Sequence, residues 1–164
     1  MAELTLHSHP VSTVFDLLGS REDDITYSVG WGLARSEHFT RSVLNEVYGN
    51  AEQGEITAIR LQESDRGTGR TDIEIETERL HLIMEAKRGW NLPFTSQLQQ
   101  YADRLNARDE REGRIAVVSE CAPYYPPVQA LPNPIDSIPV SYIPWARIAE
   151  LAKNTATASG SHAE

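Results

Sequence analysis

Three ionisable residues in the middle of the chain have types and spacing that suit metal-dependent chemistry. Asp72 begins the alternating segment TDIEIETE, and Glu85 and Lys87 end the apolar segment RLHLIMEAK that follows. Residues two apart on a β-strand face the same side, so Glu85 and Lys87 share a face. Two carboxylates from adjacent strands are oxygen ligands for a hard cation such as Mg²⁺ or Mn²⁺. The ammonium beside them can orient an attacking water and stabilise the charge of a phosphate.

The alternative interpretation of these residues is a solvated ladder of charges on an exposed sheet surface. The segment that carries Glu85 and Lys87 has apolar residues on both faces, which is typical of a strand in the middle of a sheet, covered on each side. Unpaired charges at the end of such a strand are costly and usually have a purpose. Their placement therefore favours the functional interpretation.

Hydrophobic periodicity predicts the elements that position these residues. We expect helices over 11–18, 21–36 and 38–47, then three antiparallel strands over 56–64, 71–78 and 79–87. A crossover helix over 94–109 and a strand over 114–120 follow. The proline-rich segment 121–139 predicts an ordered, irregular loop, after which come a strand over 140–143 and a closing helix over 144–153 with Pro144 in its first turn. The order predicts an α/β fold in which helices flank a mixed central sheet, and the strand after the crossover helix runs parallel to the strand before it.

Length and composition indicate one soluble domain. The chain has 164 residues, of which 40% are hydrophobic and 24% are charged. We expect the domain to span residues 1–153 and a small, polar, mobile tail to span 154–164. With 15 basic and 24 acidic residues the net charge is −9, which disfavours indiscriminate binding to nucleic acid or anionic membrane. A polyanionic partner must therefore meet a local basic patch.

Cysteine usage and the motifs present narrow the classes further. The single Cys121 can form neither an internal disulfide nor a cysteine-rich zinc site, which indicates a reducing compartment, the cytoplasm by default. No apolar run approaches the roughly 20 residues of a membrane helix, and the first residues lack the layout of a secretory signal. The sequence also lacks a Walker-type phosphate loop, an HExxH zinc helix, a GxSxG elbow and a complete GxGxxG fingerprint. Several large enzyme classes are thereby disfavoured.

The motif Asp72…Glu85-Ala86-Lys87 resembles the D…ExK core of the PD-(D/E)XK nuclease superfamily, which has a restriction-endonuclease-like fold. The resemblance continues into the next helix, where QLQQY places Gln97 and Tyr101 as the QxxxY pair of the RecB-like branch. It covers roughly residues 20–120 and includes the order of elements. Thr71 precedes Asp72, so the proline of the family's name is absent.

This resemblance implies an αβββαβ core and an Mg²⁺-dependent deoxyribonuclease. It implies Asp72 and Glu85 as metal ligands, Lys87 as the residue that orients the nucleophilic water, and Gln97 and Tyr101 as supporting residues. Such nucleases often carry an acidic residue on the N-terminal helix, and Glu22 is the position that corresponds.

Two of these residues also have plain structural interpretations. Gln97 and Tyr101 are four apart and share a helical face, where an amide and a phenol can position a water or a phosphate. Tyr101 also belongs to the apolar stripe of its helix, which is typical of a core tyrosine. Glu22, Asp23 and Asp24 are acids that the N-terminus of any helix favours.

Arginines surround the acidic motif. Arg66 and Arg70 lie in the glycine-containing segment before Asp72, and Arg88 follows Lys87, so phosphate contacts are expected there. The alternative is a hairpin loop that arginines keep soluble. Trp90, just after Arg88, could border a substrate groove. The five histidines, His7, His9, His38, His81 and His162, show no metal-ligand spacing beyond the pair at 7 and 9, and we assign them no role.

The residues thus predict a metal-dependent nuclease whose partner is nucleic acid, DNA in preference to RNA. One alternative is a non-catalytic module that binds nucleic acid or protein on the same fold, and another is an RNA-directed hydrolase, because DNA and RNA present the same phosphodiester. A domain of this size contains no separate recognition module. A homodimer or a larger partner complex is therefore expected.

Overall fold

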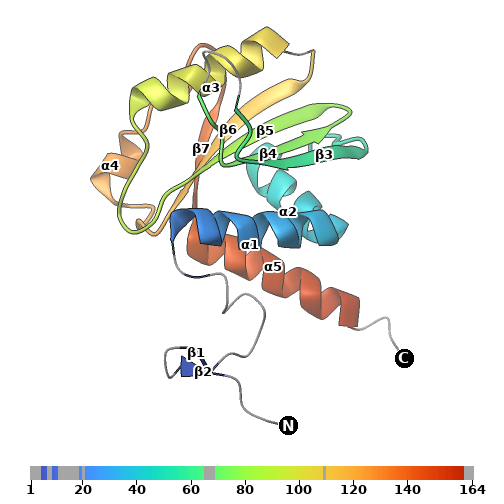
Figure 1. Ribbon diagram of the computed structural model, residues 1–164. Helices are drawn as coiled ribbons and strands as arrows, with labels where there is room; N and C mark the ends of the chain where they lie inside the picture. Colours follow the sequence, from blue (N-terminus) through green and yellow to red (C-terminus); the bar gives the residue numbers. More distant parts are fainter. Residues whose placement is uncertain are drawn as a thin grey trace.

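A computed structural model describes residues 5–6, 9–10, 19, 21–64, 69–108 and 110–160 of the chain. In chain order the elements are β1 (Thr5–Leu6), β2 (His9–Pro10), α1 (Glu22–Arg35), α2 (Glu37–Tyr48), β3 (Ile56–Leu61), β4 (Ile73–Thr77), β5 (Leu80–Ala86), α3 (Thr95–Arg108), β6 (Glu112–Ser119), α4 (Pro126–Gln129), β7 (Val140–Pro144) and α5 (Trp145–Gly160) (Figure 1).

Five strands form one mixed sheet in the order β3-β4-β5-β6-β7. The first three are antiparallel neighbours, whereas β5, β6 and β7 are parallel. Strand β5 lies at the centre, and all seven of its residues are buried. The predicted mixed sheet, the central strand and the parallel pairing across the crossover helix α3 are therefore confirmed.

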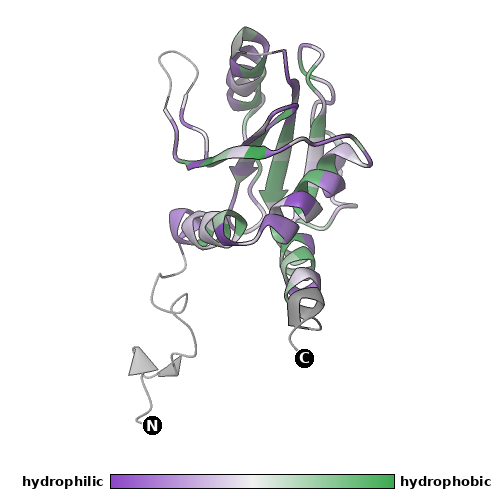
Figure 2. Ribbon diagram, turned by 90° about the vertical axis from the view of Figure 1, so that its right-hand side faces the viewer, coloured by the Kyte–Doolittle hydropathy of each residue, from purple (hydrophilic) through white to green (hydrophobic). Residues whose placement is uncertain are grey.

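Helices cover both faces of the sheet, so that two cores form. On one face, α1, α2 and α5 contribute residues such as Leu33, Val43 and Ile148 to a core that also contains Leu82 of β5. On the other face α3 packs against Ile83. Figure 1 shows α3 opposite α1 and α5, and Figure 2 shows hydrophobic residues along the strands between them. Neighbouring residues of β5 enter different cores because side chains alternate along a strand.

Three details differ from the prediction, and a fourth cannot be compared with it. Helix α5 continues to Gly160, past the expected boundary at 153, because alanine, a strong helix former, recurs through the segment. Pro144 ends β7 instead of lying in the helix. The proline-rich segment contains the short helix α4, since proline fits a first helical turn. The helix expected over 11–18 lies outside the described residues. Among the described helices, none is long and apolar enough to span a membrane.

Candidate active site

The register of β4 and β5 brings the two predicted carboxylates to the same end of the sheet. Ile73 pairs with Met84, so Asp72 and Glu85 are the next cross-strand neighbours. Asp72 is 7% exposed and Glu85 is 1% exposed, which contradicts the solvated-ladder interpretation. The backbone N–H of Ala86 donates to Asp72 Oδ2 at 2.8 Å, and this bond ties the carboxylate to the neighbouring strand.

Helix α3 places an amide and a phenol directly over Glu85. Gln97 Nε2 donates to Glu85 Oε1 at 2.7 Å and lies 3.0 Å from the Tyr101 hydroxyl. The Tyr101 hydroxyl has two acceptors for its proton, Glu85 Oε2 at 2.6 Å and the Arg70 carbonyl at 2.8 Å. Tyr101 is also fully buried among the apolar residues under α3. The ring of Tyr101 therefore belongs to the core, and its hydroxyl reaches the candidate site. Both interpretations of this residue apply.

Lys87 joins the strand end to the first turn of α1. Its ammonium is bonded to Glu85 Oε1 and lies 3.5 Å from Glu22 Oε1. The backbone of Lys87 is held on both sides, because its N–H donates to the Val118 carbonyl at 2.7 Å and its carbonyl accepts from Trp145 Nε1 at 2.9 Å. The backbone from which this ammonium extends is therefore held by β6 and by α5.

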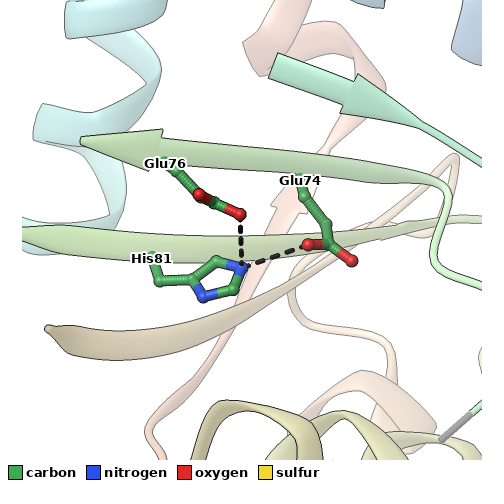
Figure 3. A group of neighbouring side chains, drawn as sticks. All are labelled: Glu74, Glu76 and His81. Atoms are coloured by element: carbon green, nitrogen blue, oxygen red, sulfur yellow. Dashed lines mark hydrogen bonds and ion pairs between the residues drawn. The ribbon is translucent and has the colours of Figure 1, made fainter. Parts of the chain in front are cut away.

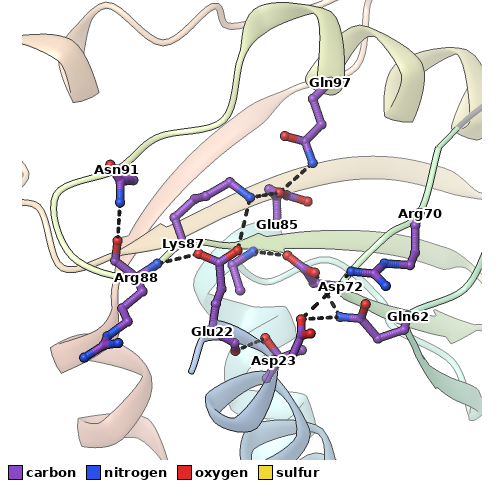
Figure 4. Close-up of polar contacts among 12 residues, drawn as sticks. Glu22, Asp23, Gln62, Arg70, Asp72, Glu85, Lys87, Arg88, Asn91 and Gln97 are labelled. Carbon is purple, nitrogen blue, oxygen red and sulfur yellow. Dashed lines mark hydrogen bonds and ion pairs between the residues drawn. The ribbon is translucent and has the colours of Figure 1, made fainter. Parts of the chain in front are cut away.

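The three acids at the start of α1 have different partners. Glu22 turns to the site, where its Oε2 also accepts the Arg88 N–H at 2.8 Å (Figure 4). Asp23 lies on the side of Asp72, since Gln62 Nε2 is 3.1 Å from Asp72 Oδ1 and 3.5 Å from Asp23 Oδ1. Asp24 instead accepts the backbone N–H of Arg21 at 2.9 Å and so stabilises the helix end. Glu22 is thus the acid of this turn that contacts Lys87.

The predicted arginines lie at the border of this group. Arg70 Nη2 is 4.0 Å from Asp23 Oδ1, and most of its side chain remains exposed. Arg88 is exposed, with its backbone bonded to Glu22. Arg66 lies outside the described residues.

Burial and like charge set the protonation of the two carboxyl groups. Burial raises the pKa of Glu85 from 4.5 to about 7, and the nearby Asp72 carboxylate adds to the rise, although Lys87 and Tyr101 oppose it. Burial also raises the pKa of Asp72, against the opposing effect of the Ala86 N–H. The two neighbouring carboxyl groups therefore resist being ionised at the same time. A cation bound between them would relieve the repulsion between their negative charges.

The donors around Glu85 are in their protonated forms. Burial alone would lower the pKa of Lys87, but its hydrogen bond to Glu85 and the charges of Glu85 and Glu22 outweigh this effect and raise it. Burial and the negative charge of Glu85 raise the pKa of Tyr101 well above its ordinary value, so the phenol stays a donor. The group therefore contains carboxylates that can bind a cation and fixed donors that orient them.

A second polar group, to which the sequence analysis assigned no role, lies under α3 further along the same strands. The imidazole Nε2 of His81 is 3.2 Å from Glu74 Oε2 and 3.9 Å from Glu76 Oε1 (Figure 3). One ligand atom from each of the three residues lies within 4.8 Å of the others, close enough to hold a metal ion. Glu74 and His81 are fully buried.

Arginines already neutralise these carboxylates. Arg104 Nη2 of α3 lies 2.5 Å from Glu74 Oε1, and Glu76 pairs with Arg60 and with Arg111 at 2.9 Å. Burial alone would raise the pKa of both acids, but hydrogen bonds from their neighbours and the arginine charges lower it. We therefore interpret this group first as an ion-pair network that holds α3 against β4. A cation here would have to share the carboxylates with arginines.

Comparison of the chain with protein-family models, curated proteins and solved structures found no significant match. The functional assignment therefore depends on the chemistry of the site. The structure brings together Asp72, Glu85, Lys87, Gln97, Tyr101 and Glu22, with Arg70 and Arg88 at the border.

Proposed function

We propose that the chain is a divalent-metal-dependent nuclease that hydrolyses phosphodiester bonds, with DNA as the preferred substrate. The observation that carries the proposal is the pair of buried carboxylates, Asp72 and Glu85, on adjacent strands beside the ammonium of Lys87. This pair lies at the carboxyl ends of the parallel strands, where ligands bind in open α/β sheets. The same residues carry the resemblance to the PD-(D/E)XK superfamily.

The donor set fits Mg²⁺ or Mn²⁺. Both candidate ligands are carboxylates, which hard cations prefer, and Glu22 adds a third carboxylate at the border. Each oxygen of Asp72 has one hydrogen-bond donor, Ala86 N–H or Gln62 Nε2, and a carboxylate oxygen can accept more than one partner. The raised pKa of Glu85 shows that its surroundings supply too little positive charge to balance the carboxylate. A bound cation would add that charge.

The chain's own residues have separable roles in this proposal. When bound, the cation would supply positive charge to the phosphate and acidify a water molecule. Gln97 and Tyr101 orient Glu85 through one bond to each of its oxygens. Lys87 holds a charge beside the carboxylates, where an ammonium can bond to the attacking water and balance charge that develops on the phosphate. Glu22 keeps that ammonium at the mouth of the site.

The direct test is cleavage by the purified chain. Plasmid, linear duplex, single-stranded DNA and RNA are incubated with Mg²⁺ or Mn²⁺, and EDTA serves as the blank. We expect metal-dependent cleavage that the Asp72→Asn variant loses and the Asp103→Asn variant keeps, because Asp103 is an exposed acid on α3. Cleavage that survives in Asp72→Asn would contradict the site.

The charge of −9 favours one rival, a non-catalytic module that keeps the fold. The same assay separates the two. If the wild-type chain binds metal and yet cleaves none of the four substrates, the non-catalytic module replaces the nuclease as the best assignment. Cleavage of RNA alone would instead identify an RNA-directed hydrolase.

A further inference from the structure

Three large aromatic side chains are exposed on the two loops beside the candidate active site. Trp90 is 58% exposed and Phe94 is 82% exposed, both between β5 and α3, and Tyr124 is 79% exposed between β6 and α4. Burying a large apolar side chain stabilises a protein by about 1.5–3 kcal/mol, so a group of them left in water indicates a binding surface. We call Trp90, Phe94 and Tyr124 the aromatic platform.

Both ends of the first loop are anchored in the site. The loop leaves β5 at Lys87 and enters α3 just before Gln97, and both residues bond to Glu85. Between them, the Arg88 N–H donates to Glu22 Oε2 at 2.8 Å, and Asn91 Nδ2 donates to the Arg88 carbonyl at 2.9 Å. The loop that carries Trp90 and Phe94 is therefore held next to Glu85 at both of its ends.

The second loop is joined to the first. The Glu120 N–H donates to the Gly89 carbonyl at 3.1 Å, and the Gly89 N–H donates to Glu120 Oε1 at 3.0 Å. The rings of Trp90 and Tyr125 meet edge to face, with centroids 4.9 Å apart and planes at 74°. These contacts hold the two loops together before any ligand arrives, which lowers the entropy cost of binding.

Charge around the platform argues against recognition through many phosphates. Two described arginines at the border of the site, Arg70 and Arg88, have acids nearby. Asp23 lies 4.0 Å from Arg70, Glu22 and Glu120 accept the backbone N–H groups of Arg88 and Gly89, and the chain carries a net charge of −9. Binding a duplex through its backbone requires a row of Lys and Arg residues. Stacking of bases on aromatic rings needs no such row, and it tolerates every sequence because each base has a π-face.

We propose that the aromatic platform stacks unpaired bases, so that the substrate of this site is a single-stranded nucleic acid or a single-stranded end. The proposal rests on the nuclease function for the orientation of the strand, with Arg88 beside a phosphate and the carboxylates at the bond to be cut. The stacking itself requires neither metal nor turnover.

Binding is measured first, by fluorescence anisotropy in EDTA, so that no strand is cut. The probes are labelled oligo(dT) and oligo(rU) of about 12 nucleotides, a duplex of the same length, and an abasic strand with the same number of phosphates. We expect oligo(dT) to bind more tightly than the duplex and the abasic strand. Trp90→Ala and Phe94→Ala should each weaken its Kd by about 5- to 100-fold. Trp31→Ala is the matched control, because Trp31 is 52% exposed and lies on α1, outside the two loops that carry the platform.

A second arm separates this inference from the nuclease assignment. Cleavage of single strands and duplexes is compared in the wild type and in the two platform variants. If oligo(dT) binding depends on the platform but no strand is ever cut, the stacking proposal is supported and the nuclease function is refuted. Two results would support the nuclease function and refute the platform. In one, the chain cuts DNA but binds the abasic strand as tightly as oligo(dT). In the other, the chain cuts DNA but the platform variants bind oligo(dT) as tightly as the wild type. Absence of oligo(dT) binding also refutes the platform.

Discussion

Replacement of Glu85 by glutamine should change how the stability of the metal-free protein depends on pH. The pKa of Glu85 is 4.5 for an ordinary glutamate and about 7 in the fold, so the folded state binds a proton more tightly than the unfolded state. The stabilisation is therefore fully present below about pH 4.5 and is lost as the pH rises through about 7. Asp72, whose pKa burial also raises, acts in the same direction. The Glu85→Gln variant has an uncharged amide at this position at every pH, so it lacks the contribution of Glu85.

The magnitude follows from the size of the pKa change. A rise from 4.5 to about 7 corresponds to roughly 3 kcal/mol of unfolding free energy. For a domain of this size, losing this much unfolding free energy lowers the Tm by about 6–12 °C. The lowered pKa values of Glu74 and Glu76 affect stability only at more acidic pH, because they act as the pH falls through their folded pKa values.

Thermal unfolding in EDTA, followed by circular dichroism from about pH 4.5 to 8.5, measures this effect. The wild type should lose stability relative to Glu85→Gln as the pH rises. Glu150→Gln, which changes an exposed acid on α5, should run parallel to the wild type. If the difference in Tm between wild type and Glu85→Gln stays constant over this range, the pKa of Glu85 is ordinary and our account of the buried carboxylate pair is wrong.

Three further predictions concern the same site. Mg²⁺ at about 100 times its Kd should stabilise the wild type by roughly 2.7 kcal/mol, and the Asp72→Asn variant should not respond; equal Tm shifts in both would remove Asp72 from the metal site. Lys87→Ala should keep its fold but lose about 100-fold or more in cleavage rate at saturating Mg²⁺, while Lys153→Ala on α5 keeps full activity; a small loss would show that the ammonium of Lys87 does not stabilise charge during the reaction. Tyr101→Phe removes a donor from Glu85, so the pKa of Glu85 should rise further and Mg²⁺ should bind more weakly at neutral pH by calorimetry; unchanged affinity would make Tyr101 a core residue alone.

The local sequence pattern predicted the sheet and the approach of Asp72 to Glu85. Alternation in β4 and apolar residues on both faces of β5 are local signals, and antiparallel pairing across a short turn makes the end of one strand meet the start of the other. The four-residue spacing of Gln97 and Tyr101 set their common helical face. The closeness of that face to Glu85 is a tertiary contact, for which only the family resemblance offered a guide.

Local pattern was insufficient for the network around Glu74 and His81. Alternating acids on a strand usually indicate a solvent-facing side, but here that side lies under α3, and the compensating Arg104 is distant in sequence. Gln62 escaped notice because no motif marks it. The backbone of Gln62 has a φ of 54°, in the left-handed region, and its side-chain amide donates to Asp72. Such contacts depend on packing that no short window of sequence contains.

In the proposed function, Asp72 and Glu85 hold the catalytic cation. Anomalous scattering from a crystal soaked in Mn²⁺ locates the ion itself, and so distinguishes the Asp72–Glu85 pair from the group of Glu74, Glu76 and His81. Our account predicts a peak between Asp72 and Glu85, with Lys87 beside it. A peak at Glu74, Glu76 and His81, with none between Asp72 and Glu85, would contradict it.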